Sequence, residues 1–347
     1  MTHGNPLFYN INDGGLEAQV HGYRAGLLTQ HDYNNLTECD NLDDMKMHLS
    51  STDYSNFLQN EPSPLNSGVI TEKATEKLVR EFNELRFHAV EPLSTFLDFI
   101  TYEYMIGNVL KLITAVRNGR GALELMYKCH PLGMFETIGA LTAAQSIDDM
   151  YEIVLADSPI GKFFTRTDKR DFDDHSTEEI RGMLYKNYLE TFYDFVQNLG
   201  GVTAEIMGEI LEFEADRAVL TITRQSFGGK TTKDRRKMLY PNFGELADIH
   251  DQLSDAEDDT YLANELKPYP LYSEMLRQVS KQVSLESLLK KRAVELNKNA
   301  FHQSFGYGLF YAFVKLREQE ISNLMWIAEC IKQDQKHRVQ EYINIYE

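Results

Sequence analysis

The chain of 347 residues carries 53 acidic and 35 basic side chains, and its formal net charge is −18. A negative field of this size repels phosphate backbones and anionic lipid headgroups, so nucleic acid is not expected as a partner. With 42% hydrophobic residues the chain can bury a sizeable core. Its length is near the limit for one core, and two or three subdomains are therefore expected.

The sequence gives few signals for targeting, metals or cofactors. Residues 1–15, MTHGNPLFYNINDGG, have neither the basic region nor the apolar stretch of a secretion signal, so a cytosolic location is expected. The longest apolar or glycine run, residues 305–314, is about half as long as a segment that crosses a bilayer. Cys39, Cys129 and Cys330 form no C-x-x-C pair, and the ten histidines show no metal-ligand spacing. No cofactor, no metal and no transmembrane segment are expected.

The first predicted element with a clear start is a helix that follows the segment 36–45, LTECDNLDDM. Asn41 sits where an N-cap belongs, because its side chain can accept a hydrogen bond from a free amide of the first turn. Asp43 and Asp44 then favour the positive end of the helix dipole. The same order of residues recurs at 141–150, LTAAQSIDDM, and in a weaker form after Leu253, with Ser146 and Asp258 as the corresponding caps.

Two phenylalanines three residues apart form a second phrase, which is also written three times. It reads TFLDFI at 95–100, TFYDFV at 191–196 and LFYAFV at 309–314. The two phenylalanines and the Ile or Val that follows fall at positions i, i+3 and i+4, which is one face of a helix. Each copy therefore predicts a helix that packs this face into a core.

Polar residues follow each phenylalanine phrase and form a third phrase. Its members are Glu103 and Asn108, then Glu212 and Arg217, then Glu318 and Asn323. Glu103 and Glu318 continue the apolar face, where a carboxylate needs a polar partner. An Asn five residues further on is about 140° round the helix and cannot reach back, so a partner from another helix is expected. We interpret this bond as structural, with a functional acid as the alternative.

Helix signals also fill the rest of the chain. A helical run starts near Thr71 and a new helix starts near Pro92, whereas the capping box Ser176-x-x-Glu179 opens a run that Gly200-Gly201 closes. Alternating strand patterns are scarce. The fold class predicted is all-α. The expected loops are 59–68, 157–176, 226–245 and 267–272.

Three phrases in the same order, three times, indicate an internal triplication. The predicted helical units are 1–120, 121–235 and 236–347. Residues 230–237, where the second and third predicted units meet, form the only strongly basic segment of an acidic chain. We interpret it as a solvated loop, with a contact to an acidic partner as the alternative.

The segment 148–152 is the best candidate for catalysis. Asp148, Asp149 and Glu152 form a D-D-x-x-E string that resembles the aspartate-rich magnesium and diphosphate site of isoprenoid synthases. No second metal motif accompanies it, and the equivalent string at 43–47 has no carboxylate at its end. A helix start explains both strings and the enzyme hypothesis only one, so the chain is not expected to be an enzyme.

Long segments of the sequence closely resemble the family of subunit d of eukaryotic V-type proton ATPases, which is related to the C subunit of archaeal-type ATPases. The segments are 7–58, EPLSTFLDFITYEYMIGNV at 91–109, KCHPLGMFE at 128–136, LYKNYLETFYDFV at 184–196, ILEFEADRA at 210–218 and 296–331. The resemblance covers most of the chain and is weakest over 160–178 and 230–290. It implies a funnel of three similar helical units, in line with the triplication.

The resemblance also implies a function. Members of the family sit on the cytoplasmic face of the proteolipid ring and receive the lower end of the central stalk, without an active site of their own. The expected partners are thus the ring and the stalk subunits, on vacuolar, endosomal or lysosomal membranes. Residues Glu212, Glu214, Asp216 and Arg217 match a strong family motif and are candidates for stalk contact or for internal contact. A soluble helical scaffold is the rival interpretation.

Overall fold

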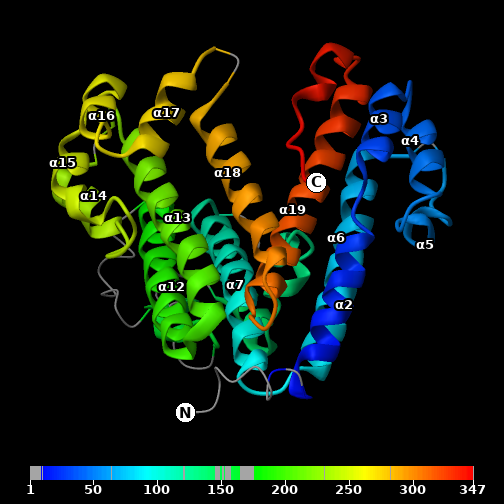
Figure 1. The fold of residues 1–347 in the computed structure, drawn as a ribbon, viewed down its shortest axis with the longest axis horizontal. Coiled ribbons are helices and arrows are strands. Elements are labelled where there is room, and N and C mark those ends of the chain that lie inside the picture. The colour runs from blue at the N-terminus through cyan, green and yellow to red at the C-terminus, as the bar shows by residue number, and fades with distance from the viewer. Residues whose placement is uncertain are drawn as a thin grey trace. The chain divides into compact units, whose positions relative to one another are not determined.

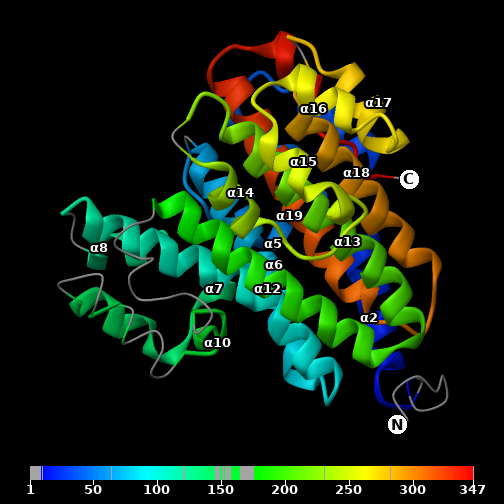
Figure 2. The same cartoon turned by 90° about the vertical axis from the view of Figure 1, so that its left-hand side faces the viewer.

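The computed structural model describes residues 9, 11–63, 65–119, 122–144, 149, 150, 152, 158–164, 176–229, 231–281 and 283–346. These residues form α-helices, short 3₁₀-helices and connections, with no β-strand among them, so the predicted all-α fold class is confirmed (Figures 1 and 2). No helix in these ranges is both long enough and apolar enough to cross a membrane.

The helices differ widely in length. The long ones are α6 (Ser67–His88), α7 (Leu93–Arg117), α12 (Thr177–Leu199), α13 (Gly201–Gln225), α18 (Leu285–Asn299) and α19 (Gly308–Lys332). Shorter ones are α2 (Gly14–Ala25), α3 (Gln30–Glu38), α4 (Leu42–Leu49), α5 (Ser55–Leu58), α8 (Ala122–Met126), α10 (Gly161–Phe164), α14 (Lys233–Leu239), α15 (His250–Asp255), α16 (Asp259–Glu265) and α17 (Pro270–Gln278). The 3₁₀-helices are η1 (Pro131–Gly133), η2 (Glu136–Ala143), η3 (Ala247–Ile249), η4 (Ala300–His302) and η5 (Lys336–Glu341).

The chain divides into two compact units. Unit 1 consists of Met1–Ser94, Gly201–Ile206 and Ser287–Glu347, and unit 2 consists of Thr95–Gly200 and Met207–Glu286. Helices α7, α13 and α18 each begin in one unit and continue into the other. Compactness and sequence repetition are different properties of a chain, and the predicted division into three similar sequence units stays a prediction.

Unit 1 is built on the long helices α6 and α19, which run antiparallel side by side (Figure 1). Ser67 at the start of α6 bonds to Glu329 near the end of α19, whereas Glu81 near the end of α6 reaches Arg317 near the start of α19. On α6 the buried residues recur every three or four positions, at Ile70, Ala74, Leu78, Phe82 and Leu85. This periodicity forms the apolar face that holds the pair together.

In unit 2, the first two copies of the phenylalanine phrase pack against each other. The ring of Phe99 stacks on Phe192 with the centroids 4.9 Å apart and on Phe195 with the centroids 4.8 Å apart. Phe96 also contacts Phe192. Phe310 of the third copy is fully buried in unit 1. The prediction that these stripes pack into a core is therefore confirmed.

Several predicted helix ends are also confirmed. The side chains of Asn41 and Asp258 accept hydrogen bonds from the amides of Asp44 and Tyr261, as N-caps do, whereas Ser146 lies outside the described residues. Ser176 and Glu179 form both bonds of the predicted capping box at the start of α12.

The expected loop at 226–245 was wrong in part, because α14 occupies its middle. Thr232 caps this helix with a hydrogen bond from the amide of Arg235. A basic string of this length can therefore form a helix once its first turn is capped and its charges are paired.

Candidate functional site

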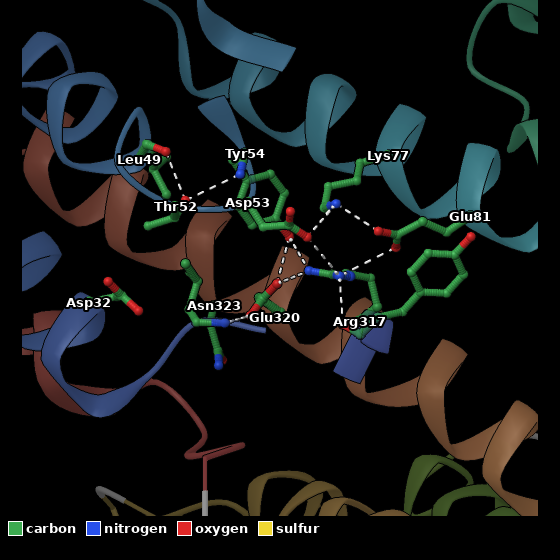
Figure 3. Close-up of polar contacts among 12 residues, drawn as sticks. Asp32, Leu49, Thr52, Asp53, Tyr54, Lys77, Glu81, Arg317, Glu320 and Asn323 are labelled. Atoms are coloured by element: carbon green, nitrogen blue, oxygen red, sulfur yellow. Dashed lines mark hydrogen bonds and ion pairs between the residues drawn. The ribbon is translucent and has the colours of Figure 1, made fainter. Parts of the chain in front are cut away.

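The most unusual feature of unit 1 is a fully buried arginine. Arg317, on α19, has no exposed side-chain surface. Its Nη1 lies 2.7 Å from Oε1 of Glu320 one turn further on, and its Nη2 lies 3.3 Å from Oε2 of Glu81 on α6 (Figure 3). The guanidinium also donates to the Tyr54 hydroxyl and to the carbonyl of Tyr23. A buried charge needs such partners, since an unpaired one costs several kcal/mol.

Lys77 extends this network along α6 towards the surface. Its Nζ lies 2.6 Å from Oε1 of Glu81 and 2.7 Å from Oδ2 of Asp53. The side chain of Lys77 is only 6% exposed, whereas that of Asp53 is 47% exposed, so Asp53 marks the surface end of the network (Figure 3). We call the set of Asp53, Tyr54, Lys77, Glu81, Arg317 and Glu320 the buried ionic network.

Glu320 ties segments that are far apart in the sequence. Its Oε2 accepts a hydrogen bond from the amide of Leu28, and its Oε1 accepts one from the hydroxyl of Tyr54, both at 2.6 Å. The turn after α2, the segment before α5 and helix α19 thus meet at one carboxylate. Unit 1 is fixed by charge-assisted bonds at its centre, and these are stronger than neutral ones.

The protonation states in the network follow from its contacts. Burial alone would lower the pKa of Arg317, but Tyr54, Glu320 and Glu81 raise it above its ordinary value. Burial and the charge of Glu320 raise the pKa of the Tyr54 hydroxyl well above its ordinary value. Arg317 therefore stays charged and Tyr54 stays neutral at physiological pH. The charged guanidinium and the neutral hydroxyl thus hold the surrounding segments in place.

Two of the predicted site residues, Asn108 and Asn323, hold backbone in the same way. The Asn108 amide donates to the carbonyl of His130 at 2.9 Å and accepts from its N–H at 2.7 Å. The Asn323 amide does the same with Ile343, at 2.7 Å and 3.1 Å. Both side chains are almost fully buried. Each Asn clamps a segment about twenty residues further along the chain, which is an observation in favour of the predicted repeat.

The expectation for the two glutamates of the same phrase was wrong at Glu318. Its side chain is 32% exposed and lies 3.1 Å from Nζ of Lys315 on its own helix, so the partner does not come from another helix. The buried carboxylate of α19 is Glu320. Glu103 on α7 is half-buried.

Helix α13 carries the other four candidates. Asp216, 1% exposed, accepts hydrogen bonds from the amides of Glu245 and Leu246 and from the hydroxyl of Tyr272. Gly244 precedes this turn with a φ of 114°, and a Cβ there would collide with Asp216. Burial raises the pKa of Asp216 to about 6, although these three bonds lower it.

The remaining three residues of the motif make pairs within unit 2. Arg217 lies 2.6 Å from Oε2 of Glu214, whose side chain is 7% exposed. Glu212 accepts a hydrogen bond from the hydroxyl of Tyr193 on α12. All four candidates on α13 thus make bonds within their own unit.

The basic segment 230–237 contacts acidic residues of the same chain. Lys233 and Lys237 pair with Asp255 and Asp251 of α15, and Arg236 is buried, where it donates to the carbonyl of Ser254. Lys230 lies outside the described residues. The segment is solvated at Lys233 and Lys237, which are exposed, but the expected loop was wrong because helix α14 begins at Lys233. The acidic groups that pair with these two lysines belong to the same chain.

The chain is similar to known proteins along nearly its whole length. A model of the ATP synthase (C/AC39) subunit family matches residues 16–342. The chain belongs to this C/AC39 family.

It is 47% identical to the V-type proton ATPase subunit d of Dictyostelium discoideum over 99% of the chain and 98% of that protein. It is also 47% identical to the V-type proton ATPase subunit d1 of Arabidopsis thaliana, over 97% of both. A more distant relative, 22% identical over 91% of the chain and 85% of that protein, is the C subunit of the A-type ATP synthase of a Desulfurococcus species. The resemblance stated from the sequence is confirmed.

The acidic string at 148–152 is only partly described in the structure. Asp149 and Glu152 are exposed, and Asp148 lies outside the described residues. Within the described ranges no group of three or more His, Cys, Asp or Glu side chains could hold a metal ion. The interpretation of the string as a helix start stays a prediction.

The buried ionic network was missed by sequence reasoning. A signal was present on α6 of the C/AC39 chain, because Lys77 and Glu81 stand in the apolar stripe between Ala74 and Leu85. A second signal was present on α19, where Arg317 follows Phe310 by seven residues, the spacing of the stripe itself. Charged residues at core positions of two helices would have indicated that the helices pair.

Proposed function

We propose that the chain is the non-catalytic d-type subunit of a V-type proton ATPase. In this proposal it docks on the cytoplasmic face of the proteolipid ring of a vacuolar, endosomal or lysosomal membrane and receives the central stalk. Rotation driven by ATP hydrolysis then passes through it to the ring and moves protons. The observation that carries the proposal is the 47% identity to V-type proton ATPase subunits d, which extends over nearly the whole of both chains.

The interior of each unit supports this role. A part that transmits torque must resist deformation, and close-packed interiors with low compressibility do so. Unit 1 has charge-assisted bonds around Arg317 at its centre, and unit 2 has the stacked rings of Phe99, Phe192 and Phe195. Both sets join helices that are distant in sequence, which is the requirement for a rigid element.

Burial divides the eight candidate residues into two groups. Asn108, Glu214, Asp216 and Asn323 are buried, and we assign them to holding the fold. Glu103, Glu212, Arg217 and Glu318 are half-buried, and we assign them to the surfaces that partner subunits contact. A charged side chain that is already paired inside its unit contributes to an interface mainly through electrostatic complementarity with the partner.

The proposal is tested by purifying the tagged chain from gently detergent-solubilised membranes and identifying the proteins that accompany it. Recovery of proteolipid-ring and stalk subunits in stoichiometric amounts is the expected result. A clean monomer from the cytosolic fraction would favour the soluble scaffold. Magnesium-dependent turnover of a prenyl diphosphate by the pure chain would instead favour the diphosphate enzyme, with Asp148, Asp149 and Glu152 at its site.

A further inference from the structure

The surface of unit 1 has a pocket of about 240 Å³ where the buried ionic network reaches solvent. Its walls come from α2, from the segment around Asp53 and Phe57, and from the last turns of α6. Asp53, Lys77 and Glu81 belong both to the network and to the pocket, and Figure 3 shows them gathered beside α6. Pockets for drug-sized ligands measure roughly 300–1,000 Å³, so this one suits a single side chain or a small ion.

Two glycines, Gly22 on α2 and Gly26 directly after it, line the pocket. A Cβ on Gly26 would collide with Oδ2 of Asp53 in its present position, so glycine lets the backbone approach this carboxylate without displacing it. At Gly22 no atom lies within 4 Å of the position that a Cβ would take, and this side of the pocket is open. The backbone at Gly26 therefore packs directly against the Asp53 carboxylate, and the pocket is open to solvent beside Gly22.

The charges of the lining favour a cation. Three carboxylates, those of Asp53, Glu81 and Glu84, face two basic groups, those of Lys77 and Arg80, and Glu81 also pairs with the buried Arg317. Lys77 is already held between Asp53 and Glu81. In the part of the chain that the structure describes, Oδ1 of Asp53 and Oε1 of Glu84 accept no hydrogen bond. Two carboxylate oxygens are thus available to a positively charged guest.

An anion is a poorer fit to the same walls. Of the two basic groups, Lys77 is 6% exposed and bonded to two carboxylates, so only Arg80 is accessible. The Arg80 guanidinium lies over the ring of Phe57, 5.4 Å from its centroid. An anion would meet one cation and three carboxylates, and like charges brought together cost free energy.

We propose that this pocket binds the side chain of a basic residue, in first place an arginine, that a partner polypeptide presents. A planar guanidinium can donate hydrogen bonds to two carboxylate oxygens at once and can lie against the ring of Tyr23. The net charge of −18 attracts basic polypeptides to the chain as a whole. The proposal stands on the pocket alone and does not depend on the proposed function.

The test uses the full chain and two small probes, N-acetyl-arginine methylamide and its neutral isostere N-acetyl-citrulline methylamide. Saturation-transfer NMR measures the binding of each. The arginine probe is expected to bind saturably in the millimolar range, as one small side chain does, and the citrulline probe at least about fivefold more weakly. Equal binding of the two probes, or no binding of the arginine probe, overturns the proposal.

Two variants locate the binding. Glu84→Gln, at an exposed position of α6, is expected to weaken the arginine probe about fivefold, whereas Glu76→Gln on the same helix, outside the pocket, leaves it unchanged. Arg80→Gln removes the competing cation and is expected to tighten the arginine probe. Inorganic phosphate that binds the parent chain but not Arg80→Gln would show an anion site instead. Equal effects of Glu84→Gln and Glu76→Gln overturn the proposal, and thermal melting confirms that each variant is folded.

Discussion

Arg317 and Glu320 lie one helical turn apart on α19, 2.7 Å from nitrogen to oxygen, and neither side chain has any exposed surface. The pair is possible only because α6, α2 and the segment before α5 bring Glu81, Tyr23 and Tyr54 to it. A buried ion pair adds little net stability compared with an apolar core of the same shape. Removing one partner, however, leaves the other as a buried charge without a counterion, which is strongly destabilising. Its role is thus to specify which segments meet.

The first prediction follows from this asymmetry. Arg317→Ala leaves Glu320 and Glu81 buried without their cation, and the free energy of unfolding is expected to fall by roughly 3–5 kcal/mol. Urea denaturation followed by circular dichroism measures it. The control is Lys332→Ala on the same helix, since Lys332 is 54% exposed and pairs with Glu329, and its effect is expected below about 0.5 kcal/mol. Similar losses for both variants contradict the assignment of the network as the centre of unit 1.

The Asn clamps give a second prediction. Asn323→Ala removes both bonds to the backbone of Ile343, which leaves a buried N–H and a buried carbonyl unpaired, at a cost of about 2–4 kcal/mol. Hydrogen exchange by mass spectrometry is expected to show faster exchange around Ile343 in this variant. Asn108→Ala is expected to do the same around His130.

The control for the clamps is Asn35→Ala, because the side chain of Asn35 bonds to an exposed His31 side chain and, among the described residues, to no distant backbone. Its exchange pattern is expected to match that of the parent chain. If Asn323→Ala left the exchange around Ile343 as slow as in the parent, the clamp would not hold this segment.

What could be predicted from the sequence was local in origin. Asn41, Ser176 and the phenylalanine stripes depend on residues within one or two turns, and short patterns report such contacts well. The partner of Arg317 on α6, Glu81, is 236 residues away, and no short pattern identifies it. Sequence reasoning chose Glu318 as the buried acid, although the periodicity fits Glu318 and Arg317 almost equally. Which of the two faces the core depends on the partner that α6 supplies, and that partner is Glu81, which pairs with Arg317.

The third prediction concerns pH. Burial raises the pKa of Asp216 to about 6, above the ordinary value of an unfolded aspartate, so the folded chain binds this proton more tightly than the unfolded chain does. The contribution of Asp216 to stability is therefore fully present below about pH 4 and is lost as the pH rises through about 6. The loss amounts to about 3 kcal/mol, since each pKa unit corresponds to about 1.4 kcal/mol.

Asp216→Asn removes this titration and is expected to flatten the dependence of the unfolding free energy on pH between about 4 and 6. Urea titrations at several pH values measure the slope. Asn198→Ala, at an exposed position of α12, changes no titratable group and is the control, which is expected to leave the slope unchanged. An equal slope in the parent chain and in Asp216→Asn contradicts the prediction.

The last prediction joins the fold to the proposed assembly. Arg217→Glu removes the pair with the buried Glu214, in which nitrogen and oxygen are 2.6 Å apart, and brings a second carboxylate to the same side of α13. The repulsion and the lost pair are expected to destabilise unit 2 by roughly 2–4 kcal/mol. Arg217→Lys keeps the charge and is the matched control, with a loss of unfolding free energy below about 1 kcal/mol.

In cells, the amount of tagged chain recovered with the proteolipid ring is expected to fall for Arg217→Glu alone. A normally assembled, proton-pumping complex that carries Arg217→Glu would refute the assignment of this residue. The side chain of Arg217 is 32% exposed, so it can contact both its own unit and a partner subunit. If Arg217 contacts only a partner subunit, Arg217→Glu would reduce assembly and leave the free energy of unfolding unchanged.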